Sequence, residues 1–548
     1  MRFVERNAFF ASLGVGVCGA AALVLMGHHP NDDAYILFRH VTNLAEHFAL
    51  RWNMVGDPEL GTHALYTSFL GLLSFVLNWS DIPSLAQITN VALLFLCGPL
   101  FYLIALDLTE NRLVALAVSL TICVNSYNVR IYSQGFEALS FVVVFFLCVY
   151  LFQHARYKSA IFLASVAPLI RPEGILLSVI GVIIIFTRRE FRKEFLAIYA
   201  AAPVAWIVFS VSYYGHFLPQ SMQAKRADMI LRPVIPLGAT FSERIEAGLN
   251  GLRGIWHVMI KPVLLTNGEA GVAMMTDLPY KAGNFFLSGG DQILYAMILV
   301  GGAAALRLLF TSDWRRVLYY AYTVFLAAFV VYAIRLEFWY LPIFVCSALL
   351  LITTGFYQVF AALSDFIRAR DFALGAAWPK TVATVASLAV AALMIGKNIY
   401  VINDGTRKYD EVRGPVYVPA HRDDVEFERY FGYRRAALIL NEYPTGMVMA
   451  NEIGVFGYYY KGPVLDTFGL CSKATVEVLE EAHRTGRPYD RLLVERLTPD
   501  YIMGGRFESY YPEMYQGFGY RLIHTDPEFQ VFGWPLDIWK REAQAPSI

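Results

Sequence analysis

Long apolar segments recur along most of this 548-residue chain, and they constrain its fold more than any other feature. Hydrophobic residues make up 57% of the sequence and charged residues only 16%, whereas a soluble chain carries roughly a quarter charged residues. A helix needs about 20 apolar residues to cross a bilayer. About eleven segments reach or approach that length, at 7–27, 84–107, 111–128, 137–153, 158–171, 173–188, 195–214, 291–311, 316–334, 337–360 and 379–400. The sequence therefore predicts an α-helical polytopic membrane protein.

Basic residues indicate how these segments are oriented, because basic loops stay in the cytoplasm. Basic clusters occur between the predicted spans, at 154–158, 188–193, 314–316 and 368–370. Residues 62–78 are also apolar, and counting them as a further span would scatter the clusters over both faces. We therefore expect 62–78 to lie in the membrane interface and the N-terminus to lie inside. The loops 28–83 and 215–290 and the tail 401–548 then share the outer side.

The composition changes to that of a soluble domain from residue 401 onward. Short apolar runs alternate with Gly and Pro turns in GMVMANEIGVFGYYY and GPVLDTFG. Residues 473–484 have a helical pattern and residues 499–503 a strand pattern. We therefore expect a transmembrane domain over 1–400 and a small α/β domain over 401–548. The tyrosines at 458–460 favour a strand with one buried face, and stacking on a sugar is the alternative.

The stretch 28–61 follows the first apolar segment and carries two adjacent carboxylates, Asp32 and Asp33. Apolar residues recur there at helical spacing, at Leu37, Val41, Leu44 and Phe48. Polar residues fall on the opposite face, at Asp32, Arg39, Asn43 and Glu46. A helix of this kind lies flat on a membrane surface and presents its polar face to water. A solvated loop between two spans is the alternative.

Several function classes lack support in the sequence. The net charge is zero, which gives no indication of a nucleic-acid partner. Of the 6 cysteines, only Cys471 lies in the polar tail, so no disulfide framework is expected there. No P-loop, dinucleotide fingerprint or nucleophile elbow occurs, which argues against nucleotide-driven transport and serine hydrolysis.

Short motifs occur in a fixed order along most of the chain. They are DDAYI-xx-R after the first span, LGTHALYT, SQGFE, RPEG, YYGHFLPQSMQAK and, in the tail, ANEIGVFGYYYKGPVLDTFGL. Each is weak alone, but the ordered set resembles the bacterial polyprenyl-phosphate-dependent glycosyltransferases of the GT-C fold, in particular the arabinofuranosyltransferase-like and protein-mannosyltransferase-like membrane enzymes. The chain departs from that pattern at His40, where the family usually has tyrosine, and at Gln220, where asparagine is common.

The resemblance implies a GT-C fold of about eleven transmembrane helices with a small C-terminal α/β domain outside the cytoplasm. It implies an enzyme of the bacterial cytoplasmic membrane that moves a sugar, with inversion, from a polyprenyl-phosphate donor to a hydroxyl of a glycan, glycolipid or protein. The sugar (arabinofuranose, mannose or aminoarabinose) and the acceptor stay open. The rival interpretation is a transporter or flippase of a lipid-linked saccharide, which would carry half-repeats that meet at mid-membrane. A non-catalytic membrane scaffold is a third possibility.

The resemblance also implies roles for the aspartate pair. In related enzymes the first acidic residue of this loop is the general base, so Asp32 is expected to take the proton of the acceptor hydroxyl. Asp33 would then orient the site or bind a divalent metal, the one cofactor that the pair suggests. The pair alone does not decide which aspartate is the base. The alternative is that both residues cap the interfacial helix.

Basic and acidic residues near the ends of the apolar segments complete the expected site. Lys225 suits a donor phosphate at headgroup depth, although a lysine beside a span end also snorkels. Arg226 could serve equally, and Arg171 is a third candidate. Charges at membrane depth are usually functional, so we expect the substrate cavity to contain Arg39, Arg130, Glu137, Glu173 and Arg335. A turn at Pro172 and an ion pair between Arg130 and Glu137 are the alternatives.

Overall fold

The computed structural model describes residues 3–28, 31–187, 191–218, 220–224, 342–368, 378–412, 425–504, 512–531 and 534–542. They fall into two compact units, each described by itself. Unit 1 draws on the ranges Met1–His28, Gln87–Pro203 and Gly238–Ala420, and unit 2 on His29–Ala86, Val204–Leu237 and His421–Ile548. The predicted spans 291–311 and 316–334 lie outside the described residues.

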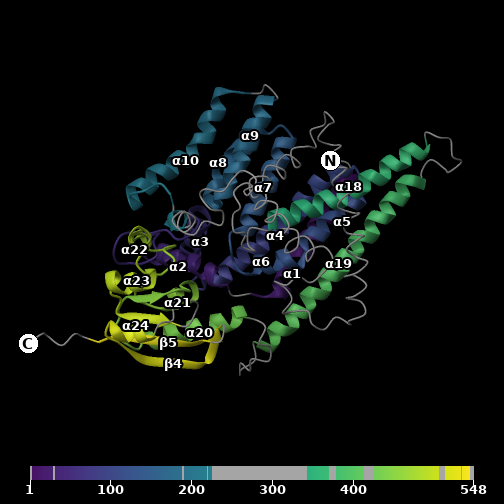
Figure 1. Cartoon of the computed structure of the whole chain (residues 1–548). Helices are drawn as coiled ribbons and strands as arrows, with labels where there is room; N and C mark the ends of the chain where they lie inside the picture. Colours follow the sequence, from purple (N-terminus) through teal and green to yellow (C-terminus); the bar gives the residue numbers. More distant parts are fainter. Residues whose placement is uncertain are drawn as a thin grey trace, which may run out of the picture. The chain divides into compact units, whose positions relative to one another are not determined.

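Unit 1 is helical wherever the sequence predicts a span within the described residues (Figure 1). Its helices are α1 (Phe3–Met26), α4 (Ile82–Thr109), α5 (Arg112–Cys123), α6 (Ser126–Ser133), α7 (Ala138–Gln153), α8 (Tyr157–Ile170), the short 3₁₀ turn η1 (Pro172–Gly174), α9 (Ile175–Thr187), α10 (Lys193–Tyr214), α18 (Pro342–Arg368) and α19 (Trp378–Val412). The first residues of α4 and the last of α10 belong to unit 2. The predicted domain boundary after residue 400 falls inside α19.

Two of these helices, Ile82–Thr109 and Lys193–Tyr214, are long and apolar enough to cross a membrane. A third span results if α5 and α6, which meet at 45°, are counted as one. The sequence predicted one span over 111–128, but the helix breaks there because the Asn125 side chain accepts a hydrogen bond from the Asn128 N–H at 3.1 Å and starts α6. Other predicted spans are shorter apolar helices, so the total of eleven stays a prediction.

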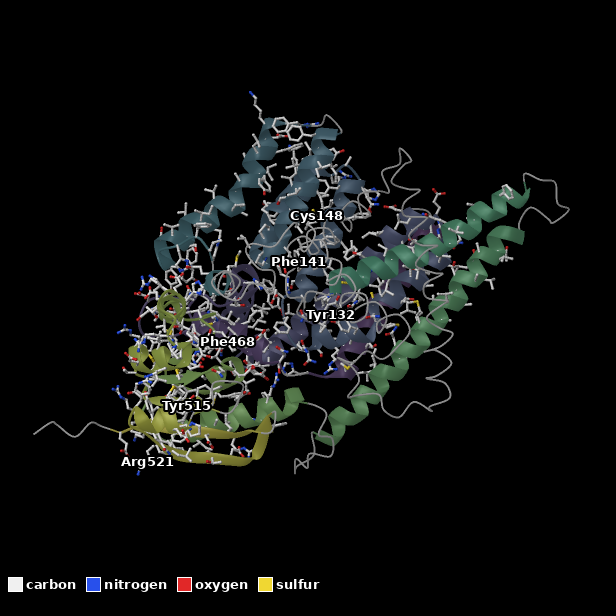
Figure 2. All side chains as sticks on the ribbon, in the orientation of Figure 1. Tyr132, Phe141, Cys148, Phe468, Tyr515 and Arg521 are labelled. Atoms are coloured by element: carbon white, nitrogen blue, oxygen red, sulfur yellow. The ribbon has the colours of Figure 1, made fainter. Side chains whose placement is uncertain are left out.

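Small residues let the helices of unit 1 approach one another closely. A Cβ at Gly16 would overlap the carbonyl of Phe95, and one at Gly98 would overlap the backbone of Gly16, so α1 and α4 cross at these glycines. The Ser119 hydroxyl donates to the Gly98 carbonyl at 2.8 Å. Close crossings at small residues are typical of helices packed in a membrane. Larger side chains fill the interior, among them the buried Tyr132, Phe141 and Cys148 (Figure 2).

Unit 2 is built around a five-stranded sheet in the order β2-β1-β3-β5-β4. The strands are β1 (Val448–Ala450), β2 (Val464–Asp466), β3 (Tyr501–Gly504), β4 (Tyr520–Val531) and β5 (Trp534–Arg541). β1 pairs in parallel with β2 and β3, with Met449 opposite Leu465 and Ile502, and β5 pairs antiparallel with β3 and β4. The helices are α2 (Asp32–His47), α3 (Ala64–Leu77), α20 (Val425–Leu440), α21 (Gly454–Tyr459), α22 (Lys473–Thr485), α23 (Tyr489–Leu497) and α24 (Pro512–Gly517).

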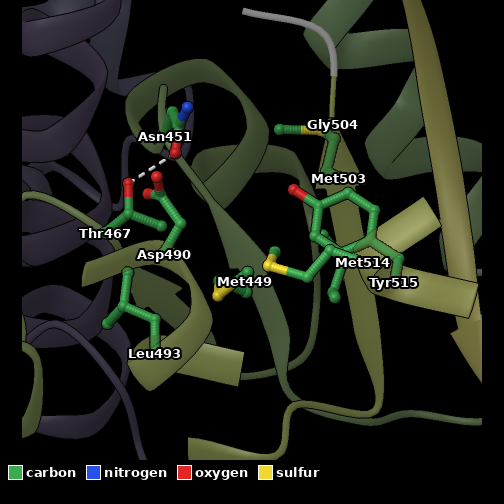
Figure 3. Close-up of a pocket in the computed structure, with 10 residues that line it drawn as sticks. Met449, Asn451, Thr467, Asp490, Leu493, Met503, Gly504, Met514 and Tyr515 are labelled. Carbon is green, nitrogen blue, oxygen red and sulfur yellow. Dashed lines mark hydrogen bonds between the residues drawn. The ribbon is translucent and has the colours of Figure 1, made fainter. Parts of the chain in front are cut away.

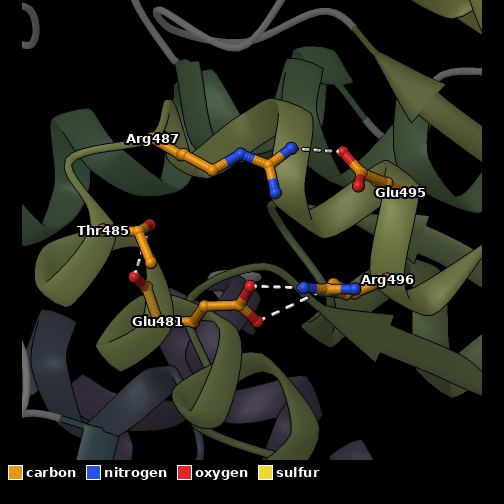
Figure 4. A network of polar contacts seen from close by, with 5 residues as sticks. All are labelled: Glu481, Thr485, Arg487, Glu495 and Arg496. Atoms are coloured by element: carbon orange, nitrogen blue, oxygen red, sulfur yellow. Dashed lines mark hydrogen bonds and ion pairs between the residues drawn. The ribbon is translucent and has the colours of Figure 1, made fainter.

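Local sequence explains α22 and β3, which both confirm the predicted elements. Ser472 caps α22 by accepting from the Thr475 N–H at 3.3 Å, and Gly486 ends it at a positive φ of 68° that glycine adopts without strain. Exposed ion pairs, Glu481–Arg496 and Arg487–Glu495, join α22 and the segment that follows it to α23 (Figure 4). The strand predicted at 458–460 is wrong, because Tyr458 and Tyr459 belong to α21 and Tyr460 ends it.

Candidate functional site

Most of the polar face of α2 is buried in unit 2. Asp32 is 7% exposed, Arg39 8% and Asn43 9%, so the expectation that this face points to water is wrong for these three residues, whereas Glu46 is exposed. The physical reason is that each residue has polar partners elsewhere in unit 2 that replace water. Asn43, for example, donates to the carbonyls of Arg51 and Trp52 at 2.9 Å each. Buried polar groups are tolerated when they are hydrogen-bonded in this way.

Asp32 holds the start of α21. Its carboxylate accepts hydrogen bonds from the backbone N–H groups of Gly454, at 2.9 Å, and Val455, at 2.8 Å. These donors are otherwise unsatisfied at a helix N-terminus, where negative charge is also stabilised. Gly454 permits the approach, because a Cβ there would overlap the Asp32 carbonyl. Asp33, one residue further along α2, is partly exposed.

Arg39 ties the segments around α2 together. Its Nε donates to the Trp52 carbonyl at 3.0 Å, and its guanidinium stacks 4.6 Å from the centre of the Trp52 ring. Its Nη atoms donate to the carbonyls of Gly457, of Tyr460 at 3.4 Å and of Gly462 at 2.9 Å. Burial lowers the pKa of Arg39 to about 10, so it stays charged at neutral pH. A role in the substrate cavity stays a prediction, since its donors are engaged by the protein here.

His40, a departure from the family pattern, is buried and neutral. Its Nδ1 lies 2.8 Å from the Ile36 carbonyl, and its Nε2 accepts from the Gly61 N–H at 3.3 Å. These contacts assign the proton to Nδ1. Burial lowers the pKa of His40 to about 4, in keeping with a ring that accepts at Nε2.

Unit 2 also contains two carboxyl groups that the sequence did not single out, those of Asp466 and Glu59. Asp466, at the end of β2, accepts from the N–H groups of Phe468 at 2.8 Å and Cys471 at 2.9 Å. Burial raises the pKa of Asp466 to about 6, and the charge of Asp32 adds to that rise. Glu59 accepts from the Lys473 N–H at 2.6 Å, and burial raises its pKa to about 7. The only sequence signal was the aspartate in the tail motif GPVLDTFGL.

Glu59 should make the stability of unit 2 depend on pH. Its pKa is higher in the folded state, so the folded chain binds more protons than the unfolded chain between about pH 4.5 and 7. The free energy of unfolding therefore falls as pH rises through that window. In Glu59→Gln this fall should become smaller, because the amide keeps an acceptor for Lys473 and does not titrate, so that of these two groups only Asp466 still contributes. Unfolding temperatures of both proteins from about pH 5 to about pH 8 measure the effect; parallel curves would contradict it.

The segment that leads to Lys225 packs in the same unit as the aspartate pair. The Tyr214 hydroxyl donates to the Leu50 carbonyl at 2.6 Å. Gln220 is buried; its backbone N–H donates to Leu60 at 3.1 Å and its side chain to Gly469 at 3.3 Å. Ala224 packs against Val476 of α22. Unit 2 therefore brings together three stretches that carry the sequence motifs: the loop after α1, the segment after α10 and the tail.

Other predicted site residues lie elsewhere. Lys225, Arg226 and Arg335 are outside the described residues. Unit 1 brings Arg171, Glu137 and Glu173 together: the buried Arg171 guanidinium pairs with Glu137 at 2.8 Å and with Glu173 at 3.5 Å. Arg130, in the same unit, is partly exposed. The turn at Pro172 is the 3₁₀ turn η1.

Metal binding by the aspartate pair also stays a prediction. Among the described residues, no group of three or more His, Cys, Asp and Glu side chains is arranged to hold a metal ion. Each Asp32 oxygen accepts a backbone N–H.

Comparisons with known proteins give a domain match and two structural likenesses. A family described as a domain of unknown function, DUF8728, matches residues 423–534. No curated protein matches the sequence. The structure is similar to ArnT from Cupriavidus metallidurans bound to undecaprenyl phosphate, with 11% identity, a TM-score of 0.44 and 98% of each chain covered. It is also similar to the arabinosyltransferase EmbB from Mycobacterium smegmatis, with 16% identity, a TM-score of 0.33, and 77% of this chain and 42% of that one covered.

Proposed function

We propose that this protein is an integral membrane glycosyltransferase of the GT-C kind. It takes a sugar from a polyprenyl-phosphate donor and passes it to a hydroxyl of a glycan, glycolipid or protein outside the cytoplasm. The acceptor oxygen attacks the anomeric carbon, the bond from that carbon to the phosphate breaks, and the lipid phosphate leaves. The hydroxyl proton goes to an aspartate. A single displacement of this kind inverts the anomeric centre.

The observation that carries the proposal is the packing within unit 2. The reaction needs a base, a cation for the departing phosphate and a surface for the acceptor. The motif-bearing stretches that supply these groups are far apart in sequence, yet Asp32 bonds to residues 454 and 455, and Gln220 bonds to Leu60 and Gly469. Ala224, which precedes Lys225, packs on α22. This convergence supports one site that includes the aspartate pair and the Lys225 segment.

Within the pair, the contacts favour Asp33 as the base. A general base must present a lone pair to the acceptor hydroxyl. Asp32 is buried and both of its oxygens accept backbone N–H groups, whereas Asp33, the next residue in the first turn of α2, is partly exposed. We therefore assign proton removal to Asp33 and the positioning of α21 to Asp32, the reverse of the roles that the family resemblance implies.

The donor phosphate is assigned to Lys225 and Arg226. A lysine ammonium or an arginine fork suits a phosphate at the membrane boundary. Arg171 is a weaker candidate, because its guanidinium already pairs with Glu137 and Glu173 and would have to exchange them for phosphate.

The full chain in membranes, supplied with a polyprenyl-phosphate-linked radioactive sugar, tests the proposal. Transfer of label to an acceptor, with release of polyprenyl phosphate, is the expected result. If the intact lipid-linked sugar instead moves across the bilayer without cleavage, the proposal is wrong and the protein is a flippase. If none of the three candidate sugars is either transferred or moved across the bilayer, the protein is non-catalytic.

A further inference from the structure

Helix α3 turns its large apolar side chains away from the rest of unit 2. The residues that it buries are mostly small or polar: Ala64, Tyr66, Thr67, Leu70, Gly71 and Ser74. Its outer face consists of large apolar residues that are from 51% to 67% exposed: Phe69, Leu72, Phe75, Val76 and Leu77. A helix on the surface of a water-soluble domain has the opposite arrangement, with its apolar face inside. The pattern of α3 is therefore that of a helix whose outer face meets an apolar medium.

Another helix of the same unit, α23, shows the ordinary arrangement. Its Leu493 belongs to the core cluster that also contains Met449 and Tyr515 (Figure 3). Its Arg496 is exposed and pairs with Glu481 on the surface (Figure 4). Helix α3, in contrast, contains no charged residue. The reversed arrangement is therefore a property of α3 and not of unit 2 as a whole.

The exposed apolar surface continues onto the end of α2. Phe48, the C-cap of α2, is 71% exposed, and its ring centre lies 4.9 Å from that of Phe75 in an edge-to-face contact. The φ angle of Phe48 is 53°, a left-handed conformation that glycine or asparagine usually supplies at a helix end. A phenylalanine in this conformation is favourable only if its ring is removed from water. Phe48 and the outer face of α3 together form one apolar patch.

Both ends of α3 are tied to helices that are long and apolar enough to cross a membrane. At its start, Ala64 packs in one cluster with Tyr214, the last residue of α10. At its end, only residues 78–81 separate Leu77 from Ile82, the first residue of α4. A connection of this length reaches at most about 18 Å. Helix α3 itself is about 21 Å long and cannot cross a hydrocarbon core of about 30 Å. If α4 and α10 cross the bilayer, as the proposed function requires, α3 runs along the membrane boundary between their ends.

These positions favour lipid as the partner of the apolar patch. The acyl chains around α4 and α10 are then the apolar medium next to it. The patch carries no charge, so removal of apolar surface from water, and not attraction to anionic headgroups, drives the contact. Trp79, 39% exposed just after α3, donates its ring N–H to the Asp81 carbonyl at 3.0 Å. Tryptophan is typical of the boundary between acyl chains and headgroups.

We propose that the apolar patch inserts into the adjacent leaflet and holds unit 2 on the membrane. The sequence predicts residues 62–78 in the membrane interface, and the structure identifies the side chains that would enter the lipid. Helix α3 packs closely on α2, because a Cβ at Gly71 would lie 2.6 Å from the Leu44 side chain. Insertion of α3 therefore also fixes the distance between the membrane surface and the aspartate pair on α2. The inference rests on the membrane location in the proposed function and not on sugar transfer.

Nitroxide labels on the full chain in lipid nanodiscs test the insertion. Cys18→Ala first removes the exposed cysteine. Single labels are then attached to Leu72→Cys in the patch, to Leu96→Cys in the middle of α4 and to Glu477→Cys on α22, all of which replace exposed residues. Oxygen, which concentrates in lipid, and a water-soluble nickel chelate relax the labels. The ratio of oxygen to nickel relaxation at Leu72→Cys should be severalfold higher than at Glu477→Cys and should approach that at Leu96→Cys.

The label on α4 separates a failure of this inference from a failure of the proposed function. If Leu72→Cys is relaxed by nickel like Glu477→Cys while Leu96→Cys is in lipid, the patch lies in water and only the inference is wrong. Shielding of Leu72→Cys from both reagents means that protein covers the patch, which also overturns the inference. If nickel relaxes Leu96→Cys as well, the membrane location itself is wrong. Unfolding temperatures identify a variant that has lost its fold, and Val76→Cys on the same face of α3 then decides.

Discussion

Asp33→Asn should reduce sugar transfer by about 10²–10⁴-fold while the protein unfolds at the wild-type temperature. The amide has nearly the shape of the carboxylate but does not take a proton from the acceptor hydroxyl. Asp33 is partly exposed near the start of α2, and its backbone N–H, which donates to Asn31 at 3.0 Å, is unaffected by the substitution. The fold of unit 2 should therefore be preserved. Initial rates at saturating donor and acceptor, with unfolding temperatures, measure both quantities.

Asp32→Asn separates the two aspartates. The asparagine side chain has a single oxygen, which can accept from the N–H group of either Gly454 or Val455. Its NH₂ group then faces the remaining N–H group, and two donors meet in a buried place. The unfolding temperature should then drop together with activity, because the start of α21 loses a partner. Full activity in Asp33→Asn, with an inactive but normally stable Asp32→Asn, would return the role of base to Asp32.

Hydropathy and local capping signals predicted much of this fold. The apolar segments within the described residues are helices. Ser472 caps the start of α22 and Gly486 ends it, as expected of serine and glycine at helix ends. The tyrosines at 458–460 were misassigned because the group that starts α21 is the Asp32 side chain, 422 residues away in sequence from Gly454. No window of neighbouring residues contains that information.

The candidate site was only partly predictable for the same reason. The two-faced pattern of α2 identified the helix and its polar residues. Amphipathicity does not distinguish a face turned to water from one that hydrogen-bonds to a distant segment, so the burial of Arg39 and Asn43 was missed. Glu59 and Asp466 were missed because their raised pKa values come from burial that only the folded unit provides.

Arg39→Met should cause the largest loss of stability in unit 2. Methionine has a similar length but removes the Arg39 donors to the carbonyls of residues 457, 460 and 462, while the Trp52 carbonyl keeps its hydrogen bond from Asn43. Each buried carbonyl left without a partner costs about 1–3 kcal/mol, so the total should be on the order of 4 kcal/mol or more. That is a large part of the roughly 5–15 kcal/mol that stabilises a typical domain. Arg39→Lys should recover little of this stability, because a single ammonium group cannot reach all the carbonyls that surround the planar guanidinium of arginine.

The matched control for Arg39, which lies in α2, is Arg51→Met in the loop that follows this helix. Arg51 is partly exposed and donates to the nearby carbonyls of Asn53 and Gly56, which water can reach after substitution. Its loss should therefore shift the unfolding temperature only slightly. Thermal unfolding and limited proteolysis of the tail compare the two variants, and early cleavage after 425 is expected only for Arg39→Met. Equal unfolding temperatures would mean that Arg39 does not hold α2 to the tail, and its buried charge would then need another explanation, such as a substrate contact.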